Sequence, residues 1–113
     1  MERDNIEYLD NFERELRRGS LVLVVLSLLG KPTHGYDLLL RIEAHHVSMD
    51  TDTLYPLLRR LEAQEILTSY WDHQTARPRK IYQLTERGKT LAKAMQTTFE
   101  KYHHTIKEII HHD

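Results

Sequence analysis

Hydrophobic residues recur at every third or fourth position in the first part of the chain. Between Asn5 and Arg18 this spacing collects them on one face of a helix, while acidic residues occupy the other faces. The apolar face consists of Ile6, Leu9, Phe12 and Leu16. Gly19 interrupts the pattern and Ser20 is a favourable N-cap, so the pattern predicts that one helix ends at Arg18 and another begins. The apolar face then needs cover from the rest of the domain or from a second subunit.

The next segment predicts a buried helix followed by a short one. Residues 21–29 are apolar almost all round, which is typical of a helix in a core. Gly30 can supply a left-handed C-terminal cap, and Pro32 prevents continuation. Thr33 is then a fresh N-cap for a helix from about His34 to His45.

An amphipathic segment follows residue 50, with leucines on one face and polar residues on another. Asp50 or Thr51 can cap a helix there. Its inward positions are Leu54, Leu57, Leu58 and Leu61, and its outward row contains Thr51, Tyr55, Arg59 and Glu62. The pattern predicts a helix with a solvent-facing polar surface.

Two runs of β-formers follow, Leu67–Trp71 and Arg79–Leu84, separated by the polar stretch Asp72–Pro78. They predict a β-hairpin with a long loop, after which Thr85 caps a last helix. Helices, a hairpin and a final helix, in this order, predict a mainly α fold with a small β-hairpin (α+β), a winged helix-turn-helix. We expect residues 1–18 to form a dimerisation helix, 19–88 the winged-helix domain and 89–113 a second dimerisation helix.

The last helix carries a heptad seam, which needs a partner helix. The seam contains Ala92, Met95, Phe99, Tyr102, Ile106 and Ile109. Only the first helix has a comparable apolar stripe, so we expect a homodimer held by both terminal helices.

Composition narrows the function classes. The chain has 113 residues, enough for one domain, and no cysteine, which excludes disulfides, thiolate metal sites and thiol nucleophiles. The longest apolar run has about half the length that spans a bilayer, and the start lacks a signal-peptide pattern, so no membrane association and a cytoplasmic location are expected. No phosphate loop, nucleophile elbow or HExxH motif is present, so neither an enzyme nor a cofactor is expected.

The net charge of −1 hides a local basic excess. Residues 77–101 contain seven basic groups against two acids, whereas residues 1–16 contain six acids and two bases. Arg77, Arg79 and Lys80 in the hairpin therefore predict contact with DNA phosphates or a minor groove. Tyr55 and Arg59, one turn apart on the helix that begins near residue 50, are suited to phosphate and base contacts.

Several motifs together resemble the PadR-like family of winged-helix transcriptional regulators. They are RRGSL before the core helix, HGYDLL at 34–39, LYPLLRRLE at 54–62, SYW at 69–71 and RPRKIYQLTERG at 77–88. The resemblance implies a cytoplasmic bacterial DNA-binding repressor that acts as a homodimer and is released from its operator by a small molecule or another signal. A two-fold protein in turn predicts a palindromic operator in double-stranded DNA.

The resemblance also implies which residues face DNA. It places the DNA-facing helix on Asp50–Glu62 and the wing on Asp72–Lys80. The contact candidates are then Thr51, Thr53, Tyr55, Arg59, Arg77, Arg79 and Lys80. Two positions depart from the family pattern, because Asp52 and Glu65 stand where glycine is usual. Asp52 would repel phosphates, and it could instead cap the helix or accept a bond from cytosine; Glu65 removes the glycine that ends the helix.

Other interpretations remain open at this stage. Asp52 favours a winged-helix module that binds protein instead of DNA. The histidines near the end (His103, His104, His111 and His112) suggest a metal sensor, but their spacing provides no third ligand, so we expect no metal. The family implies a small aromatic or amphipathic effector, for which Phe99 and Tyr102 are the candidates, although both rings could simply fill the dimer interface. Trp71 is interpreted as packing against the neighbouring helix.

Overall fold

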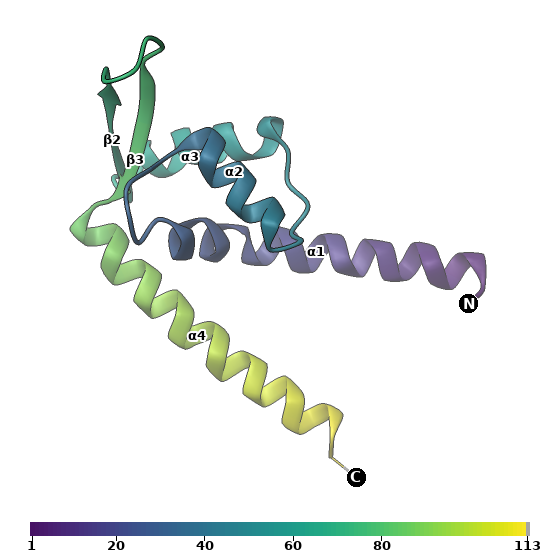
Figure 1. Ribbon diagram of the computed structural model, residues 1–113. Helices are drawn as coiled ribbons and strands as arrows, with labels where there is room; N and C mark the ends of the chain where they lie inside the picture. Colours follow the sequence, from purple (N-terminus) through teal and green to yellow (C-terminus); the bar gives the residue numbers. More distant parts are fainter. Residues whose placement is uncertain (113) are drawn as a thin grey trace.

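The computed structural model describes residues 1–112, which form four helices and a small sheet (Figure 1). The elements are, in order, α1 (Arg3–Leu28), β1 (Thr33–His34), α2 (Gly35–Ala44), α3 (Thr51–Ala63), β2 (Leu67–Asp72), β3 (Arg79–Leu84) and α4 (Glu86–Ile110). The antiparallel sheet has the strand order β1-β3-β2. The α+β winged-helix prediction is therefore confirmed.

The core lies where the second half of α1 meets α2, α3 and the start of α4. Its fully buried side chains include Leu26, Leu38, Ile42, Leu54 and Leu58. Each such side chain contributes roughly 1.5–3 kcal/mol relative to an exposed position. The four leucines predicted to face inward from α3 are all buried, which fixes the orientation of its polar side.

The predicted helix boundary at Gly19 is wrong, because α1 runs without a break from Arg3 to Leu28. Ser20 does not cap a new helix; its Oγ donates to the Leu16 carbonyl at 2.8 Å, a bond within the helix. A glycine in a helix interior costs only about 1 kcal/mol relative to alanine, which the helix on both sides absorbs. The amphipathic start is thus a rigid extension of the core helix.

The predicted connection between α1 and α2 is also wrong. No glycine among the described residues has a positive φ, so Gly30 is not a left-handed cap. Thr33 does not cap α2 either, because Thr33 and His34 form strand β1 and pair with Tyr82 and Ile81 of β3. A strand of two residues has no periodicity that a sequence pattern could reveal.

The N-terminal end of α3 has a predicted cap, whereas its C-terminal end has a left-handed residue that the sequence did not predict. The Asp50 carboxylate accepts the Thr53 backbone N–H at 2.9 Å, so Asp50 is the N-cap and Asp52 lies in the first turn. At the other end Glu65 has a φ of 60°, and Ile66 N–H donates to the Leu61 carbonyl. Glu65 therefore adopts the left-handed conformation for which glycine is usual.

The junction between the sheet and α4 depends on Thr85 and Gly88. Thr85 caps α4 as predicted, since its Oγ1 accepts the Gly88 N–H at 3.0 Å and donates to the Glu65 carbonyl at 2.7 Å. A Cβ on Gly88 would lie 2.1 Å from the Ile66 carbonyl oxygen. Glycine is required here because the helix starts directly against the end of the α3–β2 connection.

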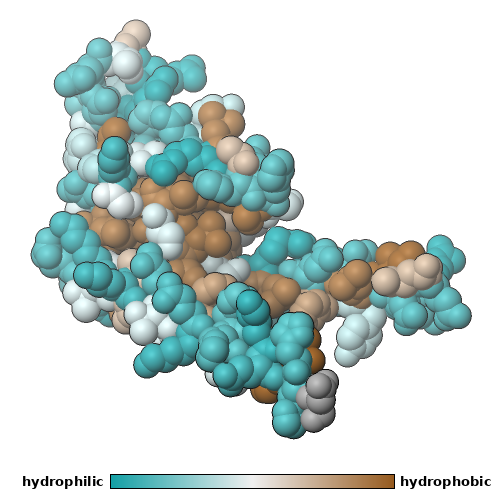
Figure 2. All heavy atoms as spheres, turned by 60° about the horizontal axis from the view of Figure 1, so that its bottom comes forward, coloured by the Kyte–Doolittle hydropathy of each residue, from teal (hydrophilic) through white to brown (hydrophobic). Residues whose placement is uncertain are grey.

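The terminal halves of α1 and α4 leave the core and diverge from each other (Figure 1). Apolar side chains remain in solvent on the projecting part of α1 (Figure 2). The predicted dimerisation residues that are exposed are Ile6, Leu9, Phe12, Leu16, Phe99, Tyr102, Ile106 and Ile109, whereas Met95 is half-buried against the core. Two large apolar faces thus have no cover within one chain.

Candidate nucleic-acid interface

Helix α3 presents the predicted contact residues in two different settings. Thr51, Thr53 and Arg59 are exposed, whereas Tyr55 is half-buried. The Tyr55 ring lies directly over Gly35 at the start of α2, where an added Cβ would approach Tyr55 Cε1 to 2.6 Å. Gly35 therefore allows the recognition helix to pack against α2. We did not predict this role, although HGY in the family motif was the available signal.

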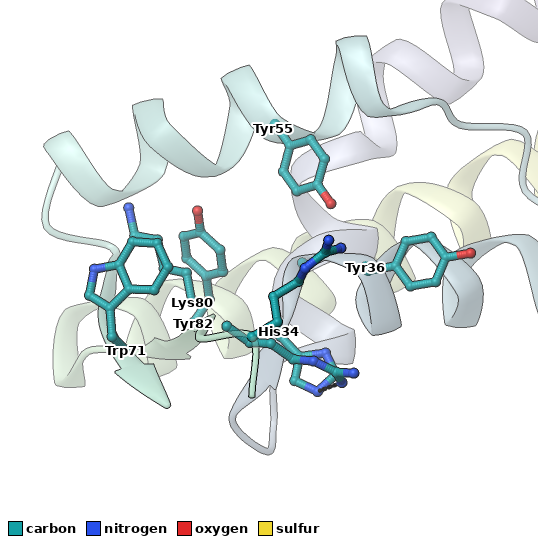
Figure 3. Close-up of a pocket in the computed structure, with 9 residues that line it drawn as sticks. His34, Tyr36, Tyr55, Trp71, Lys80 and Tyr82 are labelled. Atoms are coloured by element: carbon teal, nitrogen blue, oxygen red, sulfur yellow. Dashed lines mark hydrogen bonds between the residues drawn. The ribbon is translucent and has the colours of Figure 1, made fainter. Parts of the chain in front are cut away.

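A hollow of about 420 Å³ lies between the start of α2, helix α3 and the wing. Four of its lining residues are predicted contact residues: Tyr55, Arg77, Arg79 and Lys80. The aromatic side chains Tyr36, Trp71 and Tyr82 complete the wall, and Figure 3 shows Tyr55 pointing into this space. The fold therefore brings one residue of α3 together with three basic residues of the wing, while Arg59 and Thr51 lie outside the hollow.

Trp71 lies outside the hydrophobic core, and its packing against the neighbouring helix stays a prediction. Its side chain is 58% exposed, and among the three hairpin aromatics only Tyr82 is buried, at 5% exposure. Trp71 and Tyr82 share the sheet face toward α3, because both alternate with residues on the opposite face. Trp71 lies farther along the wing, beside the hollow instead of in the core.

Lys80 is held by groups of the protein itself. Its Nζ lies 3.2 Å from Glu62 Oε1 on α3 and 5.4 Å from the centre of the Tyr82 ring. Ser69 of β2 donates to the other oxygen of Glu62. The Ser69 hydroxyl and the Lys80 ammonium, against an opposing effect of partial burial, hold the pKa of Glu62 below its ordinary value. Glu62 thus fastens the wing to α3, a role that the sequence did not reveal.

Arg79 lies on the opposite face of β3 from Lys80 and contacts His34 of β1, directly before α2. Its Nη1 is 3.2 Å from His34 Nε2, which also lies 3.2 Å from Asp37 Oδ2. A histidine nitrogen is either an acceptor for the arginine or a donor to the carboxylate, so it satisfies one neighbour at a time. Both arginines are exposed, and Arg77 lies in the loop of the wing, away from His34. The two arginines therefore differ in how firmly the protein orients them.

A second hollow, of about 540 Å³, separates α1 from α4. Its walls include Leu16 and Leu23 of α1 and Met95, Phe99 and Tyr102 of α4. The fold thus brings both effector candidates to one space together with two of the predicted dimerisation residues. The Phe99 ring stacks on His103, with ring centres 5.8 Å apart.

The C-terminal histidines form no metal-binding cluster in the part of the chain that the structure describes. His104 instead lies 3.0 Å from Glu108 in an exposed pair. No helix within residues 1–112 has the length and apolar character to cross a bilayer.

Comparison with known proteins identifies the family. The model of the transcriptional regulator PadR-like family matches residues 22–94. The crystal structure of a PadR family transcriptional regulator from Eggerthella lenta DSM 2243 is 33% identical, covers 97% of this chain and 98% of its own, and has a TM-score of 0.89. A PadR-like transcription factor from Bacteroides fragilis is 28% identical over 88% of this chain and 98% of its own, with a TM-score of 0.74. No curated protein matches the chain. The family model matches most of the chain, and the Eggerthella lenta regulator is similar over almost the whole chain. The chain therefore belongs to the PadR-like family of transcriptional regulators.

Proposed function

We propose that this regulator is a sequence-specific repressor that binds a palindromic operator as a homodimer in the cytoplasm and is released by a small molecule. The observation that carries the DNA-binding part is the hollow that joins Tyr55 of α3 to three basic residues of the wing. Buried leucines fix the polar side of α3, which leaves Arg59 exposed to solvent and supports its role as a contact residue.

The predicted contact residues fall into two groups, those proposed to contact bases and those proposed to contact the DNA backbone. Thr51, Thr53, Tyr55 and Arg59 on α3 enter the major groove. There the Tyr55 phenol can donate to a phosphate, and an arginine can bind guanine through two hydrogen bonds. Arg77 and Arg79 follow the backbone or the minor groove beside it. Lys80 contributes mainly to the positive field, because Glu62 holds its ammonium group.

Asp52 supports a second candidate function, binding of a protein surface. Its carboxylate is exposed in the first turn of α3, where DNA phosphates would repel it. The same first turn also suits an acidic residue because of the helix dipole. A helix-stabilising role is therefore compatible with DNA binding, and the DNA titration below separates the two functions.

The release mechanism uses the hollow between α1 and α4. A small aromatic or amphipathic molecule could stack on Phe99 and hydrogen-bond to Tyr102 there. Binding would change the angle between the terminal helices, and with it the spacing of the two recognition helices. A ligand releases DNA only if it binds the DNA-free geometry more tightly. The competing occupant of this space is the partner copy itself.

Fluorescence titration with the region upstream of the chain's own gene and with random duplex DNA tests the proposal. Arg59→Ala should cost roughly 1–3 kcal/mol at one operator position and relax specificity there, because its hydrogen bonds to a base are removed. Arg79→Ala should weaken binding to both DNAs and lower the slope of log affinity against log salt by about 0.9. Equal losses on both DNAs for Arg59→Ala would remove it from the base-reading set, and a wild-type protein that binds neither DNA would favour the protein-binding function.

A further inference from the structure

A third hollow lies on another face of α1 and carries three arginines that the proposed interface does not use. The loop between α2 and α3 passes beside the middle of α1 (Figure 1). There a space of about 460 Å³ is lined by Arg14, Arg17, Arg18 and Leu21 from α1 and by Ser48, Met49, Asp50 and Thr53 from the end of this loop and the first turn of α3. Thr53 belongs to the predicted DNA-contacting set, so this hollow adjoins the recognition helix.

The charges in this hollow are poorly neutralised. Arg14 donates to the neutral Asn11 amide at 3.3 Å. Arg18 meets Glu15 only at 3.9 Å, and both side chains are largely exposed, so water screens the pair. Asp50 is the single acid among the lining residues, and its carboxylate already accepts the Thr53 N–H. Of the three guanidinium groups, Arg18 has a water-screened partner in Glu15, and the one carboxylate in the lining is occupied by a backbone N–H.

In the middle of α1 the arginines lie on a different face from Leu16 and the other residues that line the hollow toward α4. Leu16 and Leu23 line the hollow toward α4, whereas Arg14 and Arg17 line the hollow toward α3. Residues three or four apart share a helix face, so each set is continuous along the helix. A second copy seated on the apolar face would therefore leave the arginines open to solvent.

We infer that this hollow binds a phosphate group of the DNA backbone next to the bases read by α3. The inference rests on the proposed DNA-binding function and extends its footprint from α3 and the wing to α1. Guanidinium groups match phosphate because their N–H fork makes two parallel hydrogen bonds. Arg17 is the central group, since it has an arginine three positions before it and another directly after it. The contact adds affinity without reading sequence.

Salt-dependent titration of Arg17→Ala and of the double variant Arg14→Ala/Arg17→Ala tests the inference. Both should weaken binding to operator and random duplexes by the same factor. The slope of log affinity against log salt should fall by about 0.9 for each phosphate that a variant no longer neutralises. Arg17→Lys should keep the slope, because the charge remains, but should reduce affinity, because lysine has no guanidinium fork.

Arg3→Ala is the matched control. It removes the same charge from the same helix, about 16 Å from Arg14 and about 21 Å from Arg17 by the rise of 1.5 Å per residue, and should leave the slope unchanged. All the substituted side chains are exposed, so the variants should fold, which circular dichroism checks. Ethylation interference on the operator should identify phosphates whose modification weakens the wild type but not the double variant.

The outcomes separate this inference from the proposed function. One outcome refutes only the phosphate-binding hollow on α1. In that outcome the wild type binds DNA and Arg59→Ala alters base specificity, but the double variant keeps the affinity and the salt slope of the wild type. If the wild type binds no DNA, both are refuted. If the hollow binds an acidic protein segment instead of a DNA phosphate, the double variant should not change the DNA titration, which is the first of these outcomes.

Discussion

At the scale of residues, the interface is held in shape by side chains that need not touch DNA. Glu62 joins α3 to both strands of the wing through Ser69 and Lys80. Gly35 makes room for Tyr55, so α3 and α2 pack closely on the other side. The positions of Arg77 and Arg79 relative to Arg59 depend on these contacts, because the wing has no helix over its outer part.

Glu62→Gln tests the joint between α3 and the wing. The lowered pKa means that Glu62 stabilises the fold above its unfolded value of 4.5, and that this stabilisation disappears as the pH falls through the folded value. The variant should lower the free energy of unfolding by about 1 kcal/mol at pH 7, an amount typical of a hydrogen-bonded, half-buried ion pair. Urea unfolding should show this difference shrinking in acid.

Glu15→Gln is the control for this measurement. It removes an exposed carboxylate whose only ion-pair contact is at 3.9 Å, so its effect should stay within about 0.5 kcal/mol. A Glu62→Gln variant as stable as wild type at pH 7, or a difference that grows in acid, would contradict the role assigned to the carboxylate.

At the scale of elements, the sequence predicted most of the fold because most elements are long and amphipathic. The periodic leucines of α3 and the capping residues Asp50 and Thr85 indicated their helices correctly. Strand β1 could not be predicted because two residues show no periodicity. The predicted break in α1 came from treating Gly19 as a helix-breaking residue. For the candidate site, Tyr55 and the basic residues of the wing were predictable from type and order. The Glu62 joint and the arginine hollow were not, since both depend on how elements pack.

Alanine substitutions at three glycines should change the stability of the protein in different directions, because the space for an added Cβ differs between them. Gly19 lies inside α1 with nothing within 4 Å of an added Cβ, so Gly19→Ala should stabilise the protein by about 1 kcal/mol. Gly88→Ala should destabilise it, because the Cβ would meet the Ile66 carbonyl, and Gly35→Ala should do so by displacing Tyr55. Thermal unfolding at one protein concentration measures all three. A Gly19→Ala variant that melts earlier would indicate that the helix bends at this residue.

At the scale of the whole molecule, the chain is more extended than a compact domain of its length. Its radius of gyration is 16.9 Å, against about 13 Å for a compact domain of this length, and its longest dimension is 58 Å. The excess comes from the projecting ends of α1 and α4, which carry the uncovered apolar residues. Phe12 is 54% exposed and Ile109 is 69% exposed, a pattern expected of an interface and costly in water.

Ile106→Asp should therefore abolish the dimer. The side chain lies on the apolar stripe of α4, where a second copy would bury it and where a carboxylate could not be accommodated without a partner. Lys107→Asp is the control, because it places the same carboxylate one position away, off the stripe, and should leave the dimer intact. Sedimentation velocity at micromolar concentration should show a dimer for the wild type and the control and a monomer for Ile106→Asp.

The monomer should also bind the operator roughly 10²- to 10⁴-fold more weakly, since its two half-sites no longer share an effective concentration. A wild type that sediments as a monomer, or an Ile106→Asp variant that remains a dimer, would show that the terminal helices have another partner.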